Sequence, residues 1–241
     1  MSFISDPSLR EVIARTLEFG AKGKTNLADV SMDWSAEVYG SRSRNDIIFV
    51  SAGPFIGSGY FTNVAATERA GAEASLKLKW RDFDARASYA YVDATYDAAF
   101  AVLSPFNPAA DANGNIFVRS GDELPNIPHS SLQFAIGYAV TPQLHVAING
   151  HAQSGQYLRG DEANLQSRLP GFAVFGAQAE YELAPGVAFY VAATNIFDRR
   201  YATFGLYGDP TANGAFPQFA NPLFIVPAAP AAISGGIGLS F

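Results

Sequence analysis

Side chains suited to acid–base or metal chemistry are few in this 241-residue chain, which has three histidines and no cysteine. His145 and His151 fall on the same face of an alternating segment. If that segment is a strand, six residues separate the two imidazoles by about 20 Å, at the usual rise of 3.3 Å per residue. No further imidazole or carboxylate cluster accompanies them, so a polar lining is the better interpretation than a metal site.

Motifs for nucleophilic or phosphate chemistry are missing as well. The chain has no G-x-S-x-G elbow and no phosphate-binding loop. The neighbouring carboxylates of 122–123 and 161–162 fall in turn-rich segments, where adjacency in sequence does not fix the separation that acid–base catalysis needs. The sequence therefore predicts a protein that is not an enzyme and uses no cofactor.

Composition narrows the class of protein further. Charged residues make up 16% of the chain and the formal net charge is −6, with no basic stripe, which argues against a nucleic-acid partner. No run of eighteen apolar residues exists, and the most apolar stretch, 222–233, contains three prolines, so no transmembrane helix is expected. A membrane location would require strands, the other fold that satisfies its backbone in lipid.

Apolar and polar residues alternate with a period of two along most of the chain. In 131–140, for example, Leu132, Phe134, Ile136 and Tyr138 share one face, opposite small and polar residues. The pattern predicts an all-β protein. The expected strands are 11–22, 28–50, 60–80, 83–97, 129–140, 143–155, 170–184, 187–197 and 230–241.

The connections between these strands alternate in length. Tight turns are expected at 22–27, 80–83, 140–143 and 184–187, and long loops near 51–60, 97–129, 154–170 and 197–230. In an up-and-down antiparallel sheet every second connection lies on the same rim. One short-turned rim and one long-looped rim are typical of an outer-membrane β-barrel.

Two alternatives remain open at this point. One is a soluble all-β module such as a carbohydrate-binding sandwich, against which the long strands and long loops count. The other is an outer-membrane porin. The strand number also matters, because nine antiparallel strands leave the first and last running the same way and cannot close into an antiparallel ring. We therefore expect an incomplete segment of a larger transmembrane barrel.

One stretch carries a family resemblance. Residues 194–201, TNIFDRRY, are similar to the N-[LI]-F-D-x-x-Y signature near the end of TonB-dependent outer-membrane receptors. Asn195 and Asp198 suit side-chain turns that release the strand, and Phe197 and Tyr201 suit an aromatic girdle. The segments 16–23, 67–76, 88–96, 121–132 and 157–181 resemble further motifs of the family in the same order.

The resemblance implies an identity and partners. It implies the C-terminal part of a receptor barrel in the bacterial outer membrane, most like ferric-citrate and other siderophore receptors, with a ferric chelate as ligand and lipid around it. The final Phe241 resembles the C-terminal aromatic that the barrel-assembly machinery binds. Signal peptide, TonB box and plug are not visible in 1–241, so TonB would be reached only through a plug domain outside this sequence.

The resemblance also suggests where a ligand binds. Family members hold it partly on the upper barrel wall and the external loops. There this chain offers His151 on the inner face and Arg119, Arg159 and Arg168 in or beside loops. Arginine suits carboxylate-rich chelates because its guanidinium forms bidentate charge-assisted hydrogen bonds. The alternative for each residue is a solvated surface group.

Overall fold

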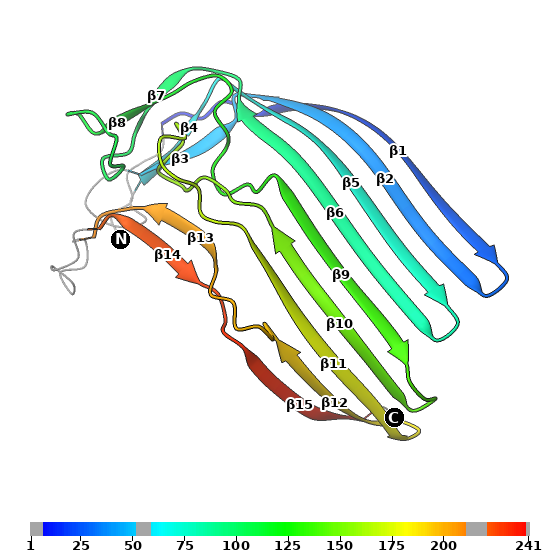
Figure 1. Cartoon of the computed structure of the whole chain (residues 1–241). Helices are drawn as coiled ribbons and strands as arrows, with labels where there is room; N and C mark the ends of the chain where they lie inside the picture. The colour runs from blue at the N-terminus through cyan, green and yellow to red at the C-terminus, as the bar shows by residue number, and fades with distance from the viewer. Residues whose placement is uncertain (1–6, 52–58, 211–220, 240–241) are drawn as a thin grey trace.

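The computed structural model describes residues 7–51, 59–210 and 221–239. Nine strands form a single antiparallel sheet in the order β1-β2-β5-β6-β9-β10-β11-β12-β15. Their bounds are β1 Ile13–Leu27, β2 Val30–Arg44, β5 Ala66–Trp80, β6 Phe83–Tyr96, β9 Ser130–Ala139, β10 Leu144–Gln153, β11 Phe172–Ala184, β12 Val187–Thr194 and β15 Ala232–Leu239. The prediction of nine strands in an open, up-and-down sheet is confirmed, and its edge strands β1 and β15 both run toward the rim of short turns (Figure 1).

Three short hairpins, which the sequence did not predict, stand at the opposite rim (Figure 1). They pair β3 Ile47–Ser51 with β4 Gly59–Asn63, β7 Phe100–Leu103 with β8 Asn115–Val118, and β13 Ala202–Tyr207 with β14 Leu223–Pro227. The strands expected over 28–50 and 60–80 are therefore each broken. Asn45 has a φ of +53°, and the Asn63 amide donates to its carbonyl at 2.6 Å, which bends the chain into the hairpin.

The first tight turn is also displaced from its predicted place at 22–27. β1 continues to Leu27, which pairs with Val30, and the turn is formed by Ala28 and Asp29, with Ala28 at a φ of +49°. Gly23, which suggested a turn, instead lies opposite Trp34 within the ladder. A Cβ on Gly23 would lie 2.7 Å from the indole Nε1, so the glycine makes room for the ring.

The same arrangement recurs in three other strand pairs. Gly71 lies opposite Tyr39, Gly150 opposite Phe134, and Gly236 opposite Tyr190. In each case a Cβ on the glycine would come within 2.6 Å of an atom of the opposing aromatic side chain. In each pair the glycine leaves room for the aromatic ring of the neighbouring strand.

The two faces of the sheet differ in chemistry as the alternation predicts. The outer face carries exposed apolar side chains, among them Leu17 and Phe19, which are 81% and 80% exposed. Trp80, Phe83 and Tyr138 form a row of contacting rings near the short turns, and Phe134, Phe175 and Phe197 form another toward the loops. Two aromatic rows around an apolar band match the lipid-facing surface of a transmembrane barrel.

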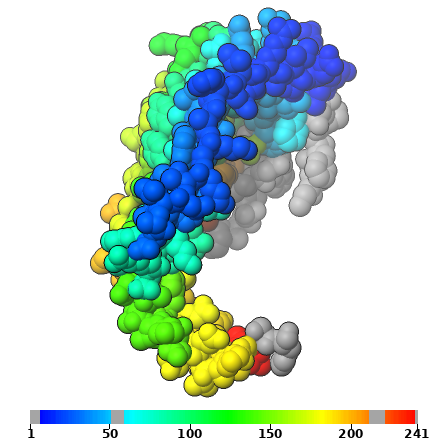
Figure 2. Space-filling view, turned by 90° about the vertical axis from the view of Figure 1, so that its right-hand side faces the viewer, coloured from blue at the N-terminus to red at the C-terminus, as the bar shows by residue number. Residues whose placement is uncertain are grey.

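The inner face is polar, and the sheet curls around it into a trough (Figure 2). Strand register places Lys77, Arg86, Gln133 and Asn149 on this face. The side chains of Ser35 and Ser75 are hydrogen-bonded across β2 and β5 at 2.7 Å. Among the described residues no second sheet covers either face, so the soluble-sandwich alternative does not hold.

Candidate functional site

The loops at the long-looped rim pack on one another instead of standing apart. Val50 of β3, Tyr96 at the end of β6, and Val102, Ile116 and Val118 of the β7–β8 hairpin form a buried apolar cluster with Ala163. Its members are separated by many residues in sequence, so the cluster joins the loops after β2, β6 and β10. We call this assembly the loop layer; it consists of 45–65, 97–129, 154–171 and 195–231 in their described parts.

A buried polar turn, residues 158–166, lies within the loop layer. Asp161 is 1% exposed, and its carboxylate accepts hydrogen bonds from the backbone N–H groups of Leu165 and Gln166 and from the Asn107 side chain, at 2.9–3.0 Å. Asn107 and Ser104 also donate to the Gly160 carbonyl, at 2.8 and 2.7 Å. These bonds fasten the loop after β10 to the loop after β6.

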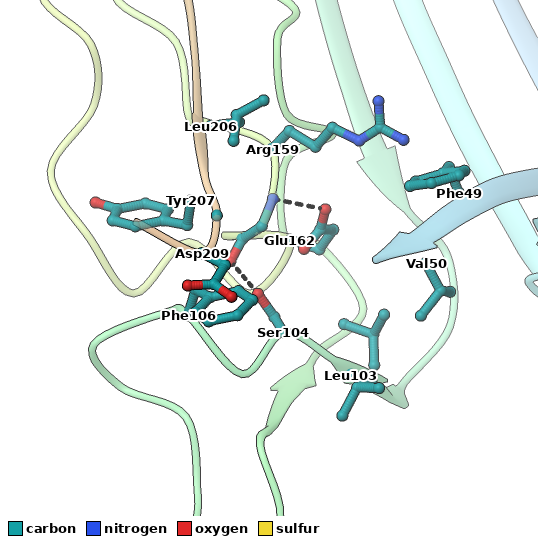
Figure 3. A pocket seen from close by; sticks show the side chains of 13 residues that line it. Phe49, Val50, Leu103, Ser104, Phe106, Arg159, Glu162, Leu206, Tyr207 and Asp209 are labelled. Carbon is teal, nitrogen blue, oxygen red and sulfur yellow. Dashed lines mark hydrogen bonds between the residues drawn. The ribbon is translucent and has the colours of Figure 1, made fainter. Parts of the chain in front are cut away.

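Next to this turn, a cavity of about 120 Å³ is lined by four segments from different parts of the chain (Figure 3). The Arg159 guanidinium lies 4.3 Å from the Phe49 ring centroid, a cation–π contact. The Glu162 carboxylate accepts from the Gly160 N–H at 3.0 Å. Pockets for drug-sized ligands span about 300–1,000 Å³. The cavity is too small to enclose a metal chelate of that size.

Burial raises the pKa of the Glu162 carboxyl, although the Gly160 N–H and the Arg159 guanidinium lower it in part. Burial likewise raises the pKa of Asp161. A carboxyl whose pKa is higher in the folded protein binds more protons there than in the unfolded chain. The stability of the 158–166 turn should therefore increase as the pH falls from neutral toward the ordinary carboxyl range, and decrease as the pH rises through the raised pKa values.

Hydrogen exchange of the 158–166 amides, corrected for the intrinsic effect of pH, tests this expectation. Protection should increase on acidification. Glu162→Gln is the matched variant, because its amide oxygen can still accept from Gly160 while the proton-binding group is gone. It should weaken the pH dependence and raise protection at neutral pH. Protection that decreases on acidification would contradict the assignment.

Arg168 is the second loop arginine, and it is engaged with other side chains. Its guanidinium is 2.5 Å from Oε1 of Glu123 and lies over the Tyr157 ring, 4.7 Å from the centroid. The other carboxylate oxygen of Glu123 is 2.8 Å from Nε2 of His129. Glu123 therefore joins the loops after β6 and β10, and Arg168 has little freedom to bind a ligand.

The two remaining ligand candidates lie apart. Arg119 follows β8 on the exposed edge of the loop layer, and its guanidinium has no partner among the described residues. His151 lies on the inner face near the looped end of β10, with its ring 5.2 Å from that of Phe172. The structure thus does not bring Arg119, Arg159, Arg168 and His151 together into one site.

The signature segment forms the turn expected for it. Asn195 is buried at a φ of +47°; its side-chain amide donates to the carbonyls of Arg199 and Ala229, at 2.9 and 3.1 Å, and its oxygen accepts from the Arg199 N–H. Asp198, also at +47°, accepts from the N–H of Ala231 at 3.1 Å. The two side chains connect the exit from β12 to the segment that enters β15.

The aromatic residues of the signature divide between the two faces. Phe197 is exposed and contacts Phe175 on the outer face, at 5.7 Å between centroids. Tyr201, expected in the same girdle, instead packs against Phe172, at 4.3 Å, and Phe172 occupies an inner-face position of β11. The chain reverses at Asn195 and Asp198 and so carries Tyr201 over the rim. Phe241 lies outside the described residues.

Sequence reasoning missed Glu123 and Phe49 as partners of the loop arginines. The opposite charges of Glu123 and Arg168 were visible, but nothing in the spacing indicated that their loops meet. In the described parts of the chain, no three His, Cys, Asp or Glu side chains are grouped so as to hold a metal ion. That part of the chain also contains no helix that is long and apolar enough to cross a membrane.

Comparison with known proteins gives the context for these features. Residues 2–196 match the model of the family described as TonB dependent receptor-like, beta-barrel. No curated protein matches the chain in sequence.

Solved structures share its fold at low identity. The siderophore receptor PiuA from Acinetobacter baumannii has a TM-score of 0.67 at 18% identity, over 93% of this chain and 28% of its own. The copper transporter OprC has a TM-score of 0.67 at 18% identity, over 97% and 32%. The ferric citrate transporter FecA has a TM-score of 0.58 at 18% identity, over 93% and 31%. The chain spans less than a third of the length of each.

Proposed function

The chain belongs to the TonB-dependent receptor β-barrel family of bacterial outer-membrane transporters, and we propose that it forms part of the wall of an importer for ferric siderophores or similar iron chelates. The family match sets aside the porin and the soluble carbohydrate-binding module as alternatives. We propose the uptake activity, the ligand and the partners for the whole receptor, of which this chain is a part.

The observation that carries the proposal is the contrast between the two rims. On one side of the apolar band the strands are joined by tight turns, and on the other by a packed loop layer above a polar inner wall (Figure 1). A wall of this kind suits capture of a ligand by the loops and its passage along the inner face. The names of PiuA and FecA support iron chelates as the ligand class, whereas that of OprC points to copper.

We further propose that residues 1–241 are the C-terminal part of the barrel. Polypeptide outside this sequence would supply the other strands and the plug through which TonB acts. The barrel-assembly machinery would bind the end of β15, and lipid would surround the outer face. Among the described residues β1 and β15 each have one unpaired edge, and this supports the arrangement, because unpaired backbone groups cannot remain exposed within a bilayer.

Uptake by living cells tests the ligand. In an iron-limited host whose genome encodes this chain, disruption of the gene should abolish uptake of at least one radiolabelled ferric siderophore or ferric citrate, and the intact gene should restore it. Copper accumulation, measured in the same strains, is the control. If the disruption lowers copper accumulation and leaves every ferric chelate unaffected, the iron-chelate proposal is wrong.

A further inference from the structure

A hollow of about 500 Å³ lies on the inner wall below the loop layer, over β5, β6, β9 and β10. This volume is within the usual range for small-molecule sites. Besides Ser75, which is hydrogen-bonded to Ser35, the lining includes six polar side chains, all of which can donate hydrogen bonds, and no carboxylate: Lys77, Arg86, Ser88, Gln133, Asn149 and His151.

Two of the six are cations placed side by side. Lys77 on β5 and Arg86 on β6 are direct partners in the ladder. Like charges in opposed positions destabilise a sheet unless something neutralises them. Neither forms an ion pair within the described residues. The nearest inner-face carboxylates form their ion pairs with other side chains: Asp33, which lies opposite Lys77 in the ladder of β2 and β5, is 3.2 Å from Lys24, and Asp84 is 2.9 Å from His145.

The remaining donors are also unused. The side chains of Gln133, Asn149 and His151 make no hydrogen bond with the described residues, although each lines the hollow. Asn149 and Arg86 both face Ala135 from the two sides of β9, so they are about 10 Å apart at two strand spacings. Alanine between them leaves that space open.

The neighbouring carboxylates lie in a separate hollow toward the loops. It includes Glu37 and Glu73 in its lining and shares Ser75, Ser88 and Gln133 with the first hollow. Glu73 is four residues from Lys77 on β5, about 13 Å along the strand. Glu73 is therefore too far from Lys77 to neutralise it directly.

We propose that Lys77, Arg86 and the amide and imidazole donors around them form a binding site for a small polyvalent oxyanion, a polycarboxylate or a phosphate ester. Arg86 supplies a planar fork of N–H donors and Lys77 a point charge, which together suit an anion with several oxygens. The site lies deeper than the loop arginines. The role of this site in import rests on the proposed function, but binding of the anion can be measured without transport.

Calorimetric titration of the full protein in detergent at about 0.15 M salt, where charges are screened beyond about 8 Å, tests the site, with metal-free citrate as one probe and pyrophosphate as the other. Saturable binding of at least one is expected. Lys77→Gln and Arg86→Gln should each weaken it about tenfold, the loss of one charge-assisted contact. Lys79→Gln is the matched control: Lys79 is another inner-face cation of β5 but lies outside the hollow, so its loss should change affinity by less than about twofold.

The two probes distinguish the sources of the oxyanion, because preference for citrate indicates a carboxylate ligand and preference for pyrophosphate a phosphate ligand. Arg86→Lys keeps the positive charge and is the control for loss of folding. It should bind the anion more tightly than Arg86→Gln does. Absence of saturable binding, or equal weakening by Lys79→Gln and Lys77→Gln, would overturn the proposal. If the anion binds as expected but cellular uptake of iron chelates does not depend on the gene, the binding site is confirmed and the proposed import function is wrong.

Discussion

Ile148→Arg should destabilise the inserted barrel, whereas Asn149→Arg should be tolerated. Ile148 is half exposed on the outer face of β10, where it opposes Ile136 on one side and Ala177 on the other. A charged side chain on the lipid face costs about 2–4 kcal/mol near the middle of the bilayer. Asn149 points to the opposite face, where the guanidinium remains in contact with water.

Equilibrium folding of the full receptor into lipid vesicles measures the difference. Ile148→Arg should lower the free energy of unfolding by about 2–4 kcal/mol relative to Asn149→Arg. Ile148→Val serves as the control for altered packing and should cost about 1 kcal/mol. Equal effects of the two arginine variants would mean that the assignment of lipid and lumen faces is wrong.

Alanine at position 195 is expected to release the junction between β12 and β15. It removes the amide that bridges Arg199 and Ala229, leaves the carbonyls of both residues without that donor, and keeps a positive φ that alanine disfavours. Each of the three lost hydrogen bonds contributes about 0.5–1.5 kcal/mol, and left-handed backbone strain adds to this. We expect a local destabilisation of about 3 kcal/mol.

Limited proteolysis from the loop side reports this opening, because residues 195–210 and 221–231 should become cleavable while the strands of the large sheet stay protected. Asn195→Gly isolates the hydrogen bonds, since glycine accepts the positive φ. It should behave more like Asn195→Ala than like the native protein. A Gly variant as resistant to cleavage as the native protein would show that backbone conformation, not the amide bridge, holds the junction.

The sequence predicts those parts of the fold in which apolar and polar residues repeat at a regular spacing. The alternation of Phe134, Ile136 and Tyr138 correctly placed these residues on one face of β9, because one face of the strand must meet lipid. The contrast of turns and loops gave the correct rims. The signature turn was also predicted correctly, since Asn195 and Asp198 act on their own neighbourhood.

The loop layer could not be predicted in the same way. Arg159 meets Phe49, and Arg168 meets Glu123, across loops that no periodic pattern relates to each other. Two of the side chains proposed as ligand contacts, Arg159 and Arg168, therefore also connect loops to one another, and their binding of a ligand stays a prediction. The inner-wall pair of Lys77 and Arg86 was missed for a different reason: each residue alone reads as a solvated strand charge, and only the ladder sets them opposite each other.

The glycine–aromatic pairs of the sheet have a consequence for how it assembles. Alternation penalises a slip of one residue between neighbouring strands, because every side chain would change face. A slip of two residues keeps all faces and escapes that penalty. It would, however, move Gly23 away from Trp34 and Gly150 away from Phe134, and bring residues with a Cβ under the rings. Hydrophobic patterning thus disfavours slips by an odd number of residues, and the glycines opposite aromatic rings disfavour slips by an even number.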